Sequence, residues 1–266
     1  MIVDEDICGL IAGKEGMPLD FVAKEFYLME LLRELSDAGV LKAMIFKGGT
    51  ALNKIYLKEN GRFSEDLDFD FVGKHWQETF KAITTKISGF ESLETRRIIR
   101  NKVVQVDFLY KTAWGKKDRV RLDINVKPYA KTAENLQMEE VASTFAGQGA
   151  GQVQVYGIND LLARKMSALK DRAEGKDIFD VSNAIDLTDR DKLLRAISLV
   201  ASDEGHTAKE FLNESIERIK DINYKKMRNI TNPYIPLRNR PSDWKILADT
   251  LSMKLHTLLD GAARQR

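Results

Sequence analysis

The sequence predicts an α+β protein in which strands dominate the first part of the chain and helices the second. Short apolar runs and runs that alternate with a period of two recur between residues 43 and 156, as expected of strands. Beyond them, apolar residues recur at helical spacing almost to the end of the chain. The composition turns small and polar at 132–151, where TFAGQGAGQ (144–152) suggests a flexible loop or lobe boundary, and we predict two domains, 1–150 and 151–266.

The composition is that of a soluble globular protein. Of the 266 residues, 43% are hydrophobic and 31% are charged, which argues against a disordered chain. No apolar run approaches the ~20 residues that span a bilayer, and the acidic start MIVDEDICGL lacks the basic region of a secretory signal. The single Cys8 cannot form an internal disulfide. We therefore expect a cytoplasmic protein with no membrane partner.

The formal net charge of +2 hides an uneven distribution. Residues 1–40 hold nine acidic side chains against three basic ones, and residues 216–266 hold eleven basic against five acidic. Residues 95–121 hold nine basic side chains against two acidic: Arg96, Arg97, Arg100, Lys102, Lys111, Lys116, Lys117, Arg119 and Arg121. Scattered, solvated charge is the ordinary explanation, but two basic regions also favour a polyanionic partner.

The first elements lead to a glycine turn. Residues 16–40 predict a helix, and residues 43–46 (AMIF) predict a short buried strand. Residues 47–50 then form a Lys-Gly-Gly-Thr turn, and residues 51–58 predict a helix that begins beside it. The amino end of a helix favours anions. Asn60-Gly61 marks a turn back into an acidic strand.

The acidic strand follows as SEDLDFDF. A period of two points Asp66, Asp68 and Asp70 to one face and the apolar residues between them to the other. Carboxylates on one face repel each other unless a cation lies between them, and a divalent cation is the usual solution. Exposed strand residues are the alternative, although aspartate is a poor strand former. We expect Asp66 and Asp68 to bind metal and Asp70 to point to solvent.

Residues 76–88 predict a helix, and three strand-like runs follow at 92–100, 102–110 and 119–126. Runs this short in succession predict antiparallel hairpins. In the third run Asp123 stands on the polar face, so it could lie beside the acidic strand.

Together these residues predict metal-dependent chemistry on a nucleotide. Two cations about 4 Å apart can activate an attacking oxygen and stabilise a leaving pyrophosphate. Oxygen ligands without histidine favour Mg²⁺ or Mn²⁺. The predicted metal ligands are Asp66, Asp68 and Asp123. The candidate phosphate-binding residues are Lys47, Gly48, Gly49 and Thr50, together with Ser64, which shares the acidic face; most Gly-Gly turns, however, are purely structural.

The second half supplies another group of charged residues. Helices are predicted at 158–172, 177–187, 189–202, 206–221 and 242–260, with a proline-containing loop at 229–241. Lys165 and Arg172 lie two helical turns apart on one face, and Asp177 and Asp180 share a face of the next helix. The two cations could hold a triphosphate. Pattern alone nevertheless favours a solvated, charged helix hairpin.

Two blocks of this sequence resemble a known family. FKGGTALNKIY followed by RFSEDLDFDFV, and later LLARKMSALKDRAEGKDIFDV, are similar to the motifs of the AbiEii/AbiGii nucleotidyltransferase toxins, within the DNA polymerase β-like superfamily. The resemblance implies a bilobed protein with a mixed-sheet core, flanking helices and a mainly helical C-terminal lobe. It implies that the phosphate of an NTP contacts Gly48, Gly49, Thr50 and Lys165, that Asp66 and Asp68 hold metal, that Asp180 or Asp177 completes the site, that Asp123 is the third carboxylate, and that Arg62 fills a recurring basic position.

The resemblance also implies a function. Such proteins transfer an NMP to the 3′ end of tRNA and so block translation, as toxins of toxin–antitoxin or phage-defence systems with a winged-helix antitoxin. The basic regions would then contact tRNA. Transfer to a protein hydroxyl or a small molecule is the first alternative. A non-catalytic binding module that acts only through its antitoxin is the second.

Overall fold

The computed structural model describes residues 3–98, 103–127, 131–147, 149–220 and 222–264. Of the basic residues noted above, Arg100, Lys102 and the side chains of Arg96 and Arg97 lie outside this description. The chain forms two compact units, the first comprising Met1–Pro128, Leu136–Val155 and Tyr234–Arg238, and the second the remainder. The domain limits 1–150 and 151–266 stay a prediction.

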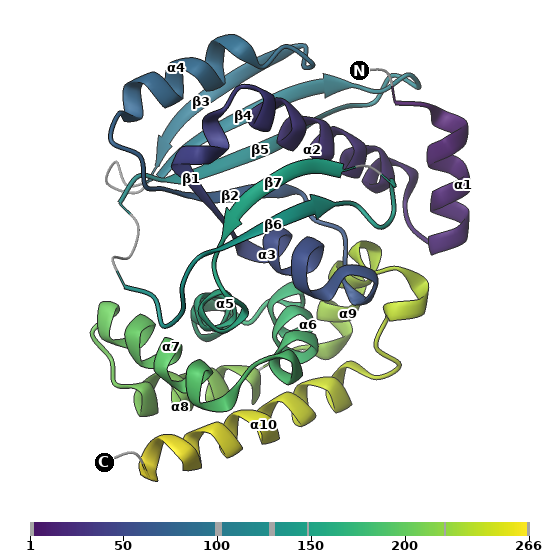
Figure 1. The fold of residues 1–266 in the computed structure, drawn as a ribbon. Helices are drawn as coiled ribbons and strands as arrows, with labels where there is room; N and C mark the ends of the chain where they lie inside the picture. The colour runs from purple at the N-terminus through teal and green to yellow at the C-terminus, as the bar shows by residue number, and fades with distance from the viewer. Residues whose placement is uncertain (1–2, 99–102, 128–130, 148, 221, 265–266) are drawn as a thin grey trace. The chain divides into compact units, whose positions relative to one another are not determined.

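The first unit is built on a mixed sheet, which confirms the predicted α+β class (Figure 1). Among the described residues seven strands pair in the order β3-β4-β5-β2-β1-β7-β6. They are β1 (Met44–Lys47), β2 (Asp66–Phe71), β3 (Ser92–Ile98), β4 (Val103–Lys111), β5 (Lys117–Asn125), β6 (Gln137–Ala142) and β7 (Gly149–Val155). Strand β2 pairs antiparallel with β1 and parallel with β5, while β3, β4 and β5 form the predicted antiparallel hairpins.

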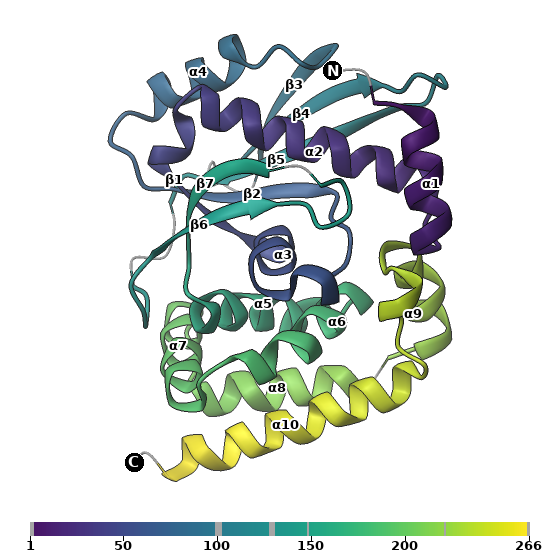
Figure 2. The same ribbon diagram turned by 45° about the vertical axis from the view of Figure 1, so that its right-hand side comes forward.

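Helices cover both faces of the middle of this sheet. Figure 2 shows α2 (Leu19–Asp37) and α3 (Gly48–Ala51) on opposite sides of β1, β2 and β7. Helix α2 buries a row of leucines at helical spacing against the apolar face of the strands: Leu28, Leu31, Leu32 and Leu35. Helix α3 continues as a π-helical turn, Leu52–Leu57. Helix α4 (Trp76–Lys86) was predicted, whereas α1 (Glu5–Glu15) was not.

The flexible loop or lobe boundary predicted at 144–152 overlaps β7, which begins at Gly149, and a further strand precedes it in the small, polar stretch. Residues Gln137–Ala142 form β6, an edge strand that pairs antiparallel with β7. Its sequence, QMEEVA, alternates poorly, and Val141 is its one fully buried residue. Edge strands commonly carry charged residues, which discourage pairing with another chain. The pattern that marks a strand is therefore weak here.

The second unit is helical. Its elements are α5 (Ile158–Arg172), α6 (Gly175–Ala184), α7 (Arg190–Asp203), α8 (Ala208–Lys220), α9 (Tyr224–Thr231) and α10 (Trp244–Arg264). Helix α5 packs against α7 and α8, and α10 packs against α8 and α6. The fully buried Leu162, Ile178, Ile197 and Phe211 form its core. Helix α9 occupies residues for which no helix was predicted.

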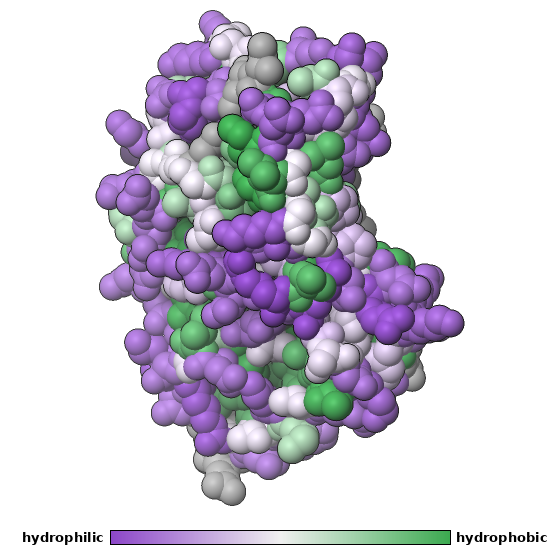
Figure 3. Space-filling view, turned by 90° about the vertical axis from the view of Figure 1, so that its right-hand side faces the viewer, coloured by the Kyte–Doolittle hydropathy of each residue, from purple (hydrophilic) through white to green (hydrophobic). Residues whose placement is uncertain are grey.

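Hydrophilic residues prevail on the face of the molecule that carries α1 (Figure 3). Figure 3 shows the face that carries α1, where hydrophobic groups occur in small patches between hydrophilic ones. Ile7 and Leu10 are the exposed large hydrophobic residues of α1. Within the part of the chain that the structure describes, no helix has both the length and the apolar character to cross a membrane.

Candidate active site

The acidic face of β2 lies between two strands that bring charged residues to it. The register places Asp68 beside Lys47 of β1 and beside Asp123 of β5. Asp66 lies beside Arg121 of β5. Residues at the same register position in neighbouring strands project from the same face of a sheet. The prediction that Asp123 stands beside the Asp66–Asp68 strand is therefore confirmed.

The glycine turn packs directly against this acidic face. Gly48 has φ +73°, a backbone conformation that residues other than glycine rarely adopt. A Cβ atom at Gly48 would lie 2.1 Å from Oδ2 of Asp68, so glycine is required for the approach as well. Thr50 is fully buried, and its hydroxyl donates a 2.6 Å hydrogen bond to the carbonyl oxygen of Asp66. Thr50 thus fixes the first residue of β2.

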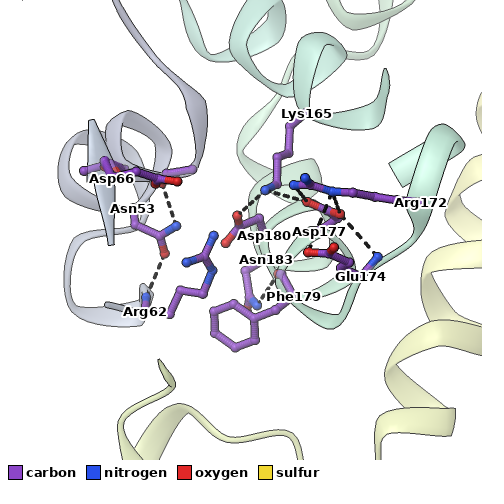
Figure 4. Close-up of polar contacts among 12 residues, drawn as sticks. Asn53, Arg62, Asp66, Lys165, Arg172, Glu174, Asp177, Phe179, Asp180 and Asn183 are labelled. Atoms are coloured by element: carbon purple, nitrogen blue, oxygen red, sulfur yellow. Dashed lines mark hydrogen bonds and ion pairs between the residues drawn. The ribbon is translucent and has the colours of Figure 1, made fainter. Parts of the chain in front are cut away.

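Asn53, which the sequence analysis did not identify, connects the turn to the segment that enters β2. Its Nδ2 donates to the carbonyl oxygen of Gly49 at 2.8 Å, and its Oδ1 accepts from the backbone N–H of Arg62 at 2.7 Å (Figure 4). The Arg62 side chain is buried, and its Nη1 donates to the carbonyl oxygen of Phe63 at 2.9 Å. An asparagine inside a predicted helix, four residues after a glycine, is the available signal, because asparagine is a poor helix former.

The position of Asp70 differs from the predicted one. Its side chain is 1% exposed and its Oδ1 lies 2.6 Å from Nζ of Lys47, so the prediction that it points to solvent is wrong. Strand β2 is an interior strand, and Lys47 on the neighbouring β1 supplies the charge that lets a carboxylate remain buried. The predicted phosphate ligand Lys47 thus has a carboxylate partner within the protein. Ser64 is buried, and its hydroxyl has no hydrogen-bond partner among the described residues.

Asp123 and Asp66 interact electrostatically. Burial, followed by the charge of Asp66, raises the pKa of Asp123 to about 6, against the lowering effect of Arg121 and of a hydrogen bond from Gln105. The Oδ1 atom of Asp123 is buried without a hydrogen-bond partner in the described part of the chain. Repelling carboxylates with a free oxygen suit a cation. The described residues nevertheless contain no group of three or more His, Cys, Asp or Glu side chains arranged to hold a metal ion.

In the second unit, α5 and α6 bring the four predicted charged residues together (Figure 4). Nζ of Lys165 lies 2.8 Å from Oδ1 of Asp177 and 2.9 Å from Oδ2 of Asp180. Both carboxylates are fully buried, and the Lys165 side chain is 9% exposed. The interpretation as a solvated hairpin is therefore wrong for these three residues, whereas Arg172 is about half exposed.

Asp177 is the most heavily bonded member of this cluster. It accepts hydrogen bonds from Nε and Nη2 of Arg172, at 2.9 and 3.2 Å, and from the backbone N–H of Glu174 at 3.2 Å. The last contact belongs to a capping box that begins α6. Burial alone would raise the pKa of Asp177, but the charge of Lys165 and the hydrogen bonds from Arg172 and Lys165 lower it to about 2. The cluster therefore holds a carboxylate that stays ionised.

The glycine turn packed against an acidic strand in a mixed sheet agrees with the family that the sequence motifs predict. The chain belongs to the family described as nucleotidyl transferase AbiEii toxin, type IV toxin–antitoxin system, whose model matches residues 30–257. The predicted family is confirmed. This protein is therefore a nucleotidyltransferase toxin, with an NTP as substrate and an antitoxin as partner.

The fold is shared with solved structures of low sequence identity. MenT4, a nucleotidyltransferase toxin from Mycobacterium tuberculosis, is 19% identical, with a TM-score of 0.67 over 95% of this chain and 89% of that one. JHP933 from Helicobacter pylori is 17% identical, with a TM-score of 0.55 over 94% of this chain and 96% of that one. No curated protein matches the sequence.

Proposed function

We propose that this toxin transfers an NMP from an NTP to the 3′ end of an RNA, with tRNA as the acceptor, and so blocks translation. The observation that carries the proposal is the contact between Gly48 and Asp68. A glycine turn exposes backbone N–H groups to a phosphate. Here that turn touches the carboxylate row, so a phosphate bound at the turn would lie beside Asp68 and Asp66.

The reaction is an in-line displacement. The 3′-hydroxyl oxygen of the acceptor forms a bond to the α-phosphorus of the NTP, and the bond from that phosphorus to the oxygen of the leaving pyrophosphate breaks. The hydroxyl proton passes to a nearby base or to water. The protein's contribution is mainly positioning and neutralisation of charge.

Asp66 and Asp123 would hold a divalent cation, Mg²⁺ or Mn²⁺, with Asp68 as a further ligand. The buried Oδ1 of Asp123 and its repulsion by Asp66 support this assignment. Magnesium retains several waters and often uses only one or two carboxylates, so a preformed set of three is unnecessary. When bound, the cation would neutralise charge on the reacting phosphate.

We assign different roles to the two aspartates of α6. Asp177 is engaged by Lys165, Arg172 and the backbone of Glu174, so we propose that it positions Lys165. Asp180 would then be the residue that acts at the nucleotide, with Lys165 and Arg172 as triphosphate contacts. This assignment rests on the family resemblance together with the bonding of Asp177.

The partners follow from charge and family. Lys117, Arg119 and Arg121 of β5, together with the basic residues of 216–266, would contact RNA phosphates. The antitoxin would be a winged-helix protein encoded beside the toxin, and the pair would serve in phage defence.

Incubation with tRNA, Mg²⁺ or Mn²⁺ and each labelled NTP tests the proposal. We expect a labelled tRNA with one or more added nucleotides, and its loss in an Asp66→Ala variant whose melting temperature is unchanged. Label in protein or in a small molecule instead of RNA would establish one of the alternative acceptors. A folded Asp66→Ala protein that remains fully toxic on expression would show that toxicity needs no catalysis.

A further inference from the structure

A pocket of about 580 Å³ opens beside Asp66 in the first unit. It lies where β5 continues beyond β2, because the first residue of β2, Asp66, pairs with Arg121 while β5 begins at Lys117. The residues that line it include Asp66, Glu94, Lys117, Arg119 and Arg121. We call it the β5 pocket. Its volume is of the order that a nucleotide-sized ligand occupies.

The β5 pocket and the glycine turn lie on opposite flanks of β2. Strand order in the sheet is β5-β2-β1, and the turn follows β1 directly. Gly48 approaches Asp68 from the β1 side, whereas the β5 pocket reaches Asp66 from the β5 side. A transferase must bring a donor and an acceptor to the same carboxylates from different directions. The glycine turn suits the donor phosphate, so the β5 pocket is available for the acceptor.

Three cations line the pocket at alternate positions of one strand. Lys117, Arg119 and Arg121 share a face of β5 and follow each other about every 6.6 Å, ending next to Asp123. This repeat is of the same order as the spacing of successive phosphates in an extended strand. Among the described residues Lys117 has no ion-pair partner, and no hydrogen bond engages Nη1 or Nη2 of Arg121. These groups can therefore donate to a ligand.

Asp107 of β4 aims the two arginines. Its side chain is 2% exposed, accepts a 2.9 Å hydrogen bond from Nε of Arg121 and lies 3.5 Å from Nη1 of Arg119. A buried carboxylate that fixes one edge of a guanidinium leaves the other edge oriented for a second anion. The side chains of Arg119 and Arg121 remain 47% and 31% exposed.

Carboxylates also line the β5 pocket, so it is not a general polyanion surface. Glu65 and Asp118 lie 4.0 and 3.0 Å from Nζ of Lys24, which neutralises them in part. Glu94 lies on β3, and Glu91 is the residue before that strand. Carboxylates accept hydrogen bonds from ribose hydroxyls and base amino groups, and they repel the phosphates of a second strand. This mixture favours one strand over a duplex.

We propose that the β5 pocket binds the 3′-terminal nucleotides of a single-stranded RNA acceptor. The backbone phosphates lie on Lys117, Arg119 and Arg121, and the terminal hydroxyl is directed toward Asp66 and Asp123. Asp107 is a positioning residue. The inference rests on the proposed function and adds the acceptor's form, its path along β5 and the residues that hold it.

Fluorescence anisotropy with a 5′-labelled single-stranded RNA that has a free 3′-hydroxyl tests the pocket. We expect Arg119→Ala and Arg121→Ala each to weaken binding roughly tenfold, and the salt dependence of log Kd to fall by about 0.7 per lost phosphate contact. Asp107→Asn should weaken RNA binding when Arg119 and Arg121 are both present, but it should have little further effect in a variant that lacks both arginines. Lys81→Ala, on exposed α4, is the matched control and should bind as the wild type does.

Steady-state NMP transfer separates this inference from the proposed function. The arginine variants should raise the KM for RNA and leave the KM for NTP unchanged. RNA labelling by the wild type, with unchanged RNA affinity in both folded arginine variants, would refute the β5 pocket while the transferase proposal stands. A rise in the KM for NTP alone would assign the pocket to the donor and also refute it. If the wild type labels no RNA, anisotropy still decides: equal affinity for a blunt duplex, or no binding, overturns the inference.

Discussion

Replacing Asp177 with asparagine removes one charge from the buried cluster around Lys165 while it keeps the shape of the side chain. A pKa lowered from 3.8 to about 2 corresponds to about 2 kcal/mol of unfolding free energy at neutral pH. Removing one partner of a buried ion pair typically costs ~3–5 kcal/mol, and Asp180, which also contacts Lys165, reduces that cost. We expect Asp177→Asn to lower the free energy of unfolding by about 2–4 kcal/mol at pH 7.

The pH dependence supplies an independent check. The pKa of Asp177 is lower in the folded than in the unfolded chain, so its stabilising effect is complete above about pH 4 and disappears as the pH falls through about 2. The difference in stability between wild type and Asp177→Asn should therefore shrink to about half at pH 3. Urea denaturation followed by circular dichroism at pH 7 and pH 3 measures both values.

Arg172→Ala is the matched control. Its guanidinium contacts the same carboxylate but is 54% exposed, so we expect a loss of about 1 kcal/mol or less. A loss below about 1 kcal/mol for Asp177→Asn at pH 7 would contradict the reasoning. So would a difference between wild type and variant that is the same at both pH values.

Three further predictions concern the glycine turn and the first residue of the acidic strand. Gly48→Ala should abolish NMP transfer, because a Cβ would lie 2.1 Å from Oδ2 of Asp68; Gly115→Ala, which also has positive φ but nothing within 4 Å, should retain activity. Thr50→Val removes the hydroxyl that donates to the Asp66 carbonyl, so it should lower the free energy of unfolding by about 1 kcal/mol and reduce kcat. A thermal melt measures the first effect and initial rates measure the second; an unchanged kcat would contradict this prediction. Asp66→Asn should abolish transfer with little change in melting temperature, since Asp66 is exposed.

Much of the sheet could be predicted from the sequence because its strands alternate clearly. The period of two in β2 and β5 places Asp66, Asp68 and Asp123 on polar faces, and the register then puts Asp68 beside Asp123. The helices α1 and α9 and the strand β6 were not predicted. Strand β6 pairs with the next strand, β7, at separations from 7 residues (Ala142 to Gly149) to 18 (Gln137 to Val155), but its own sequence alternates too weakly to mark it as a strand.

The side-chain contacts within the site were harder to predict from the sequence than the strands. The sequence marks Lys47 and Asp70 as charged, but their ion pair follows from strand order, which brings β1 beside β2. Likewise Lys165 and Asp177 read as surface charges on two helices, because burial depends on what packs over the helices. The role of Asn53 becomes clear from its hydrogen bonds to the carbonyl of Gly49 and the backbone N–H of Arg62. Side-chain partners of this kind are properties of the packed state.

The placement of β2 between β1 and β5 gives the acidic row its chemical use. An antiparallel neighbour on one side ends at the glycine turn, so the phosphate-binding backbone meets the row at Asp68. The parallel neighbour on the other side, β5, starts four residues before Arg121, the residue that pairs with Asp66. The cations of β5 therefore precede the acidic row along the strand direction and lead to it. Reversing the direction of either neighbour would carry the turn or the cations to the far end of the row. The strand directions therefore bring donor and acceptor to the same end of the acidic row, and the strand order keeps them on opposite flanks. Arg119 and Arg121 should accordingly affect RNA, and Gly48 should affect NTP.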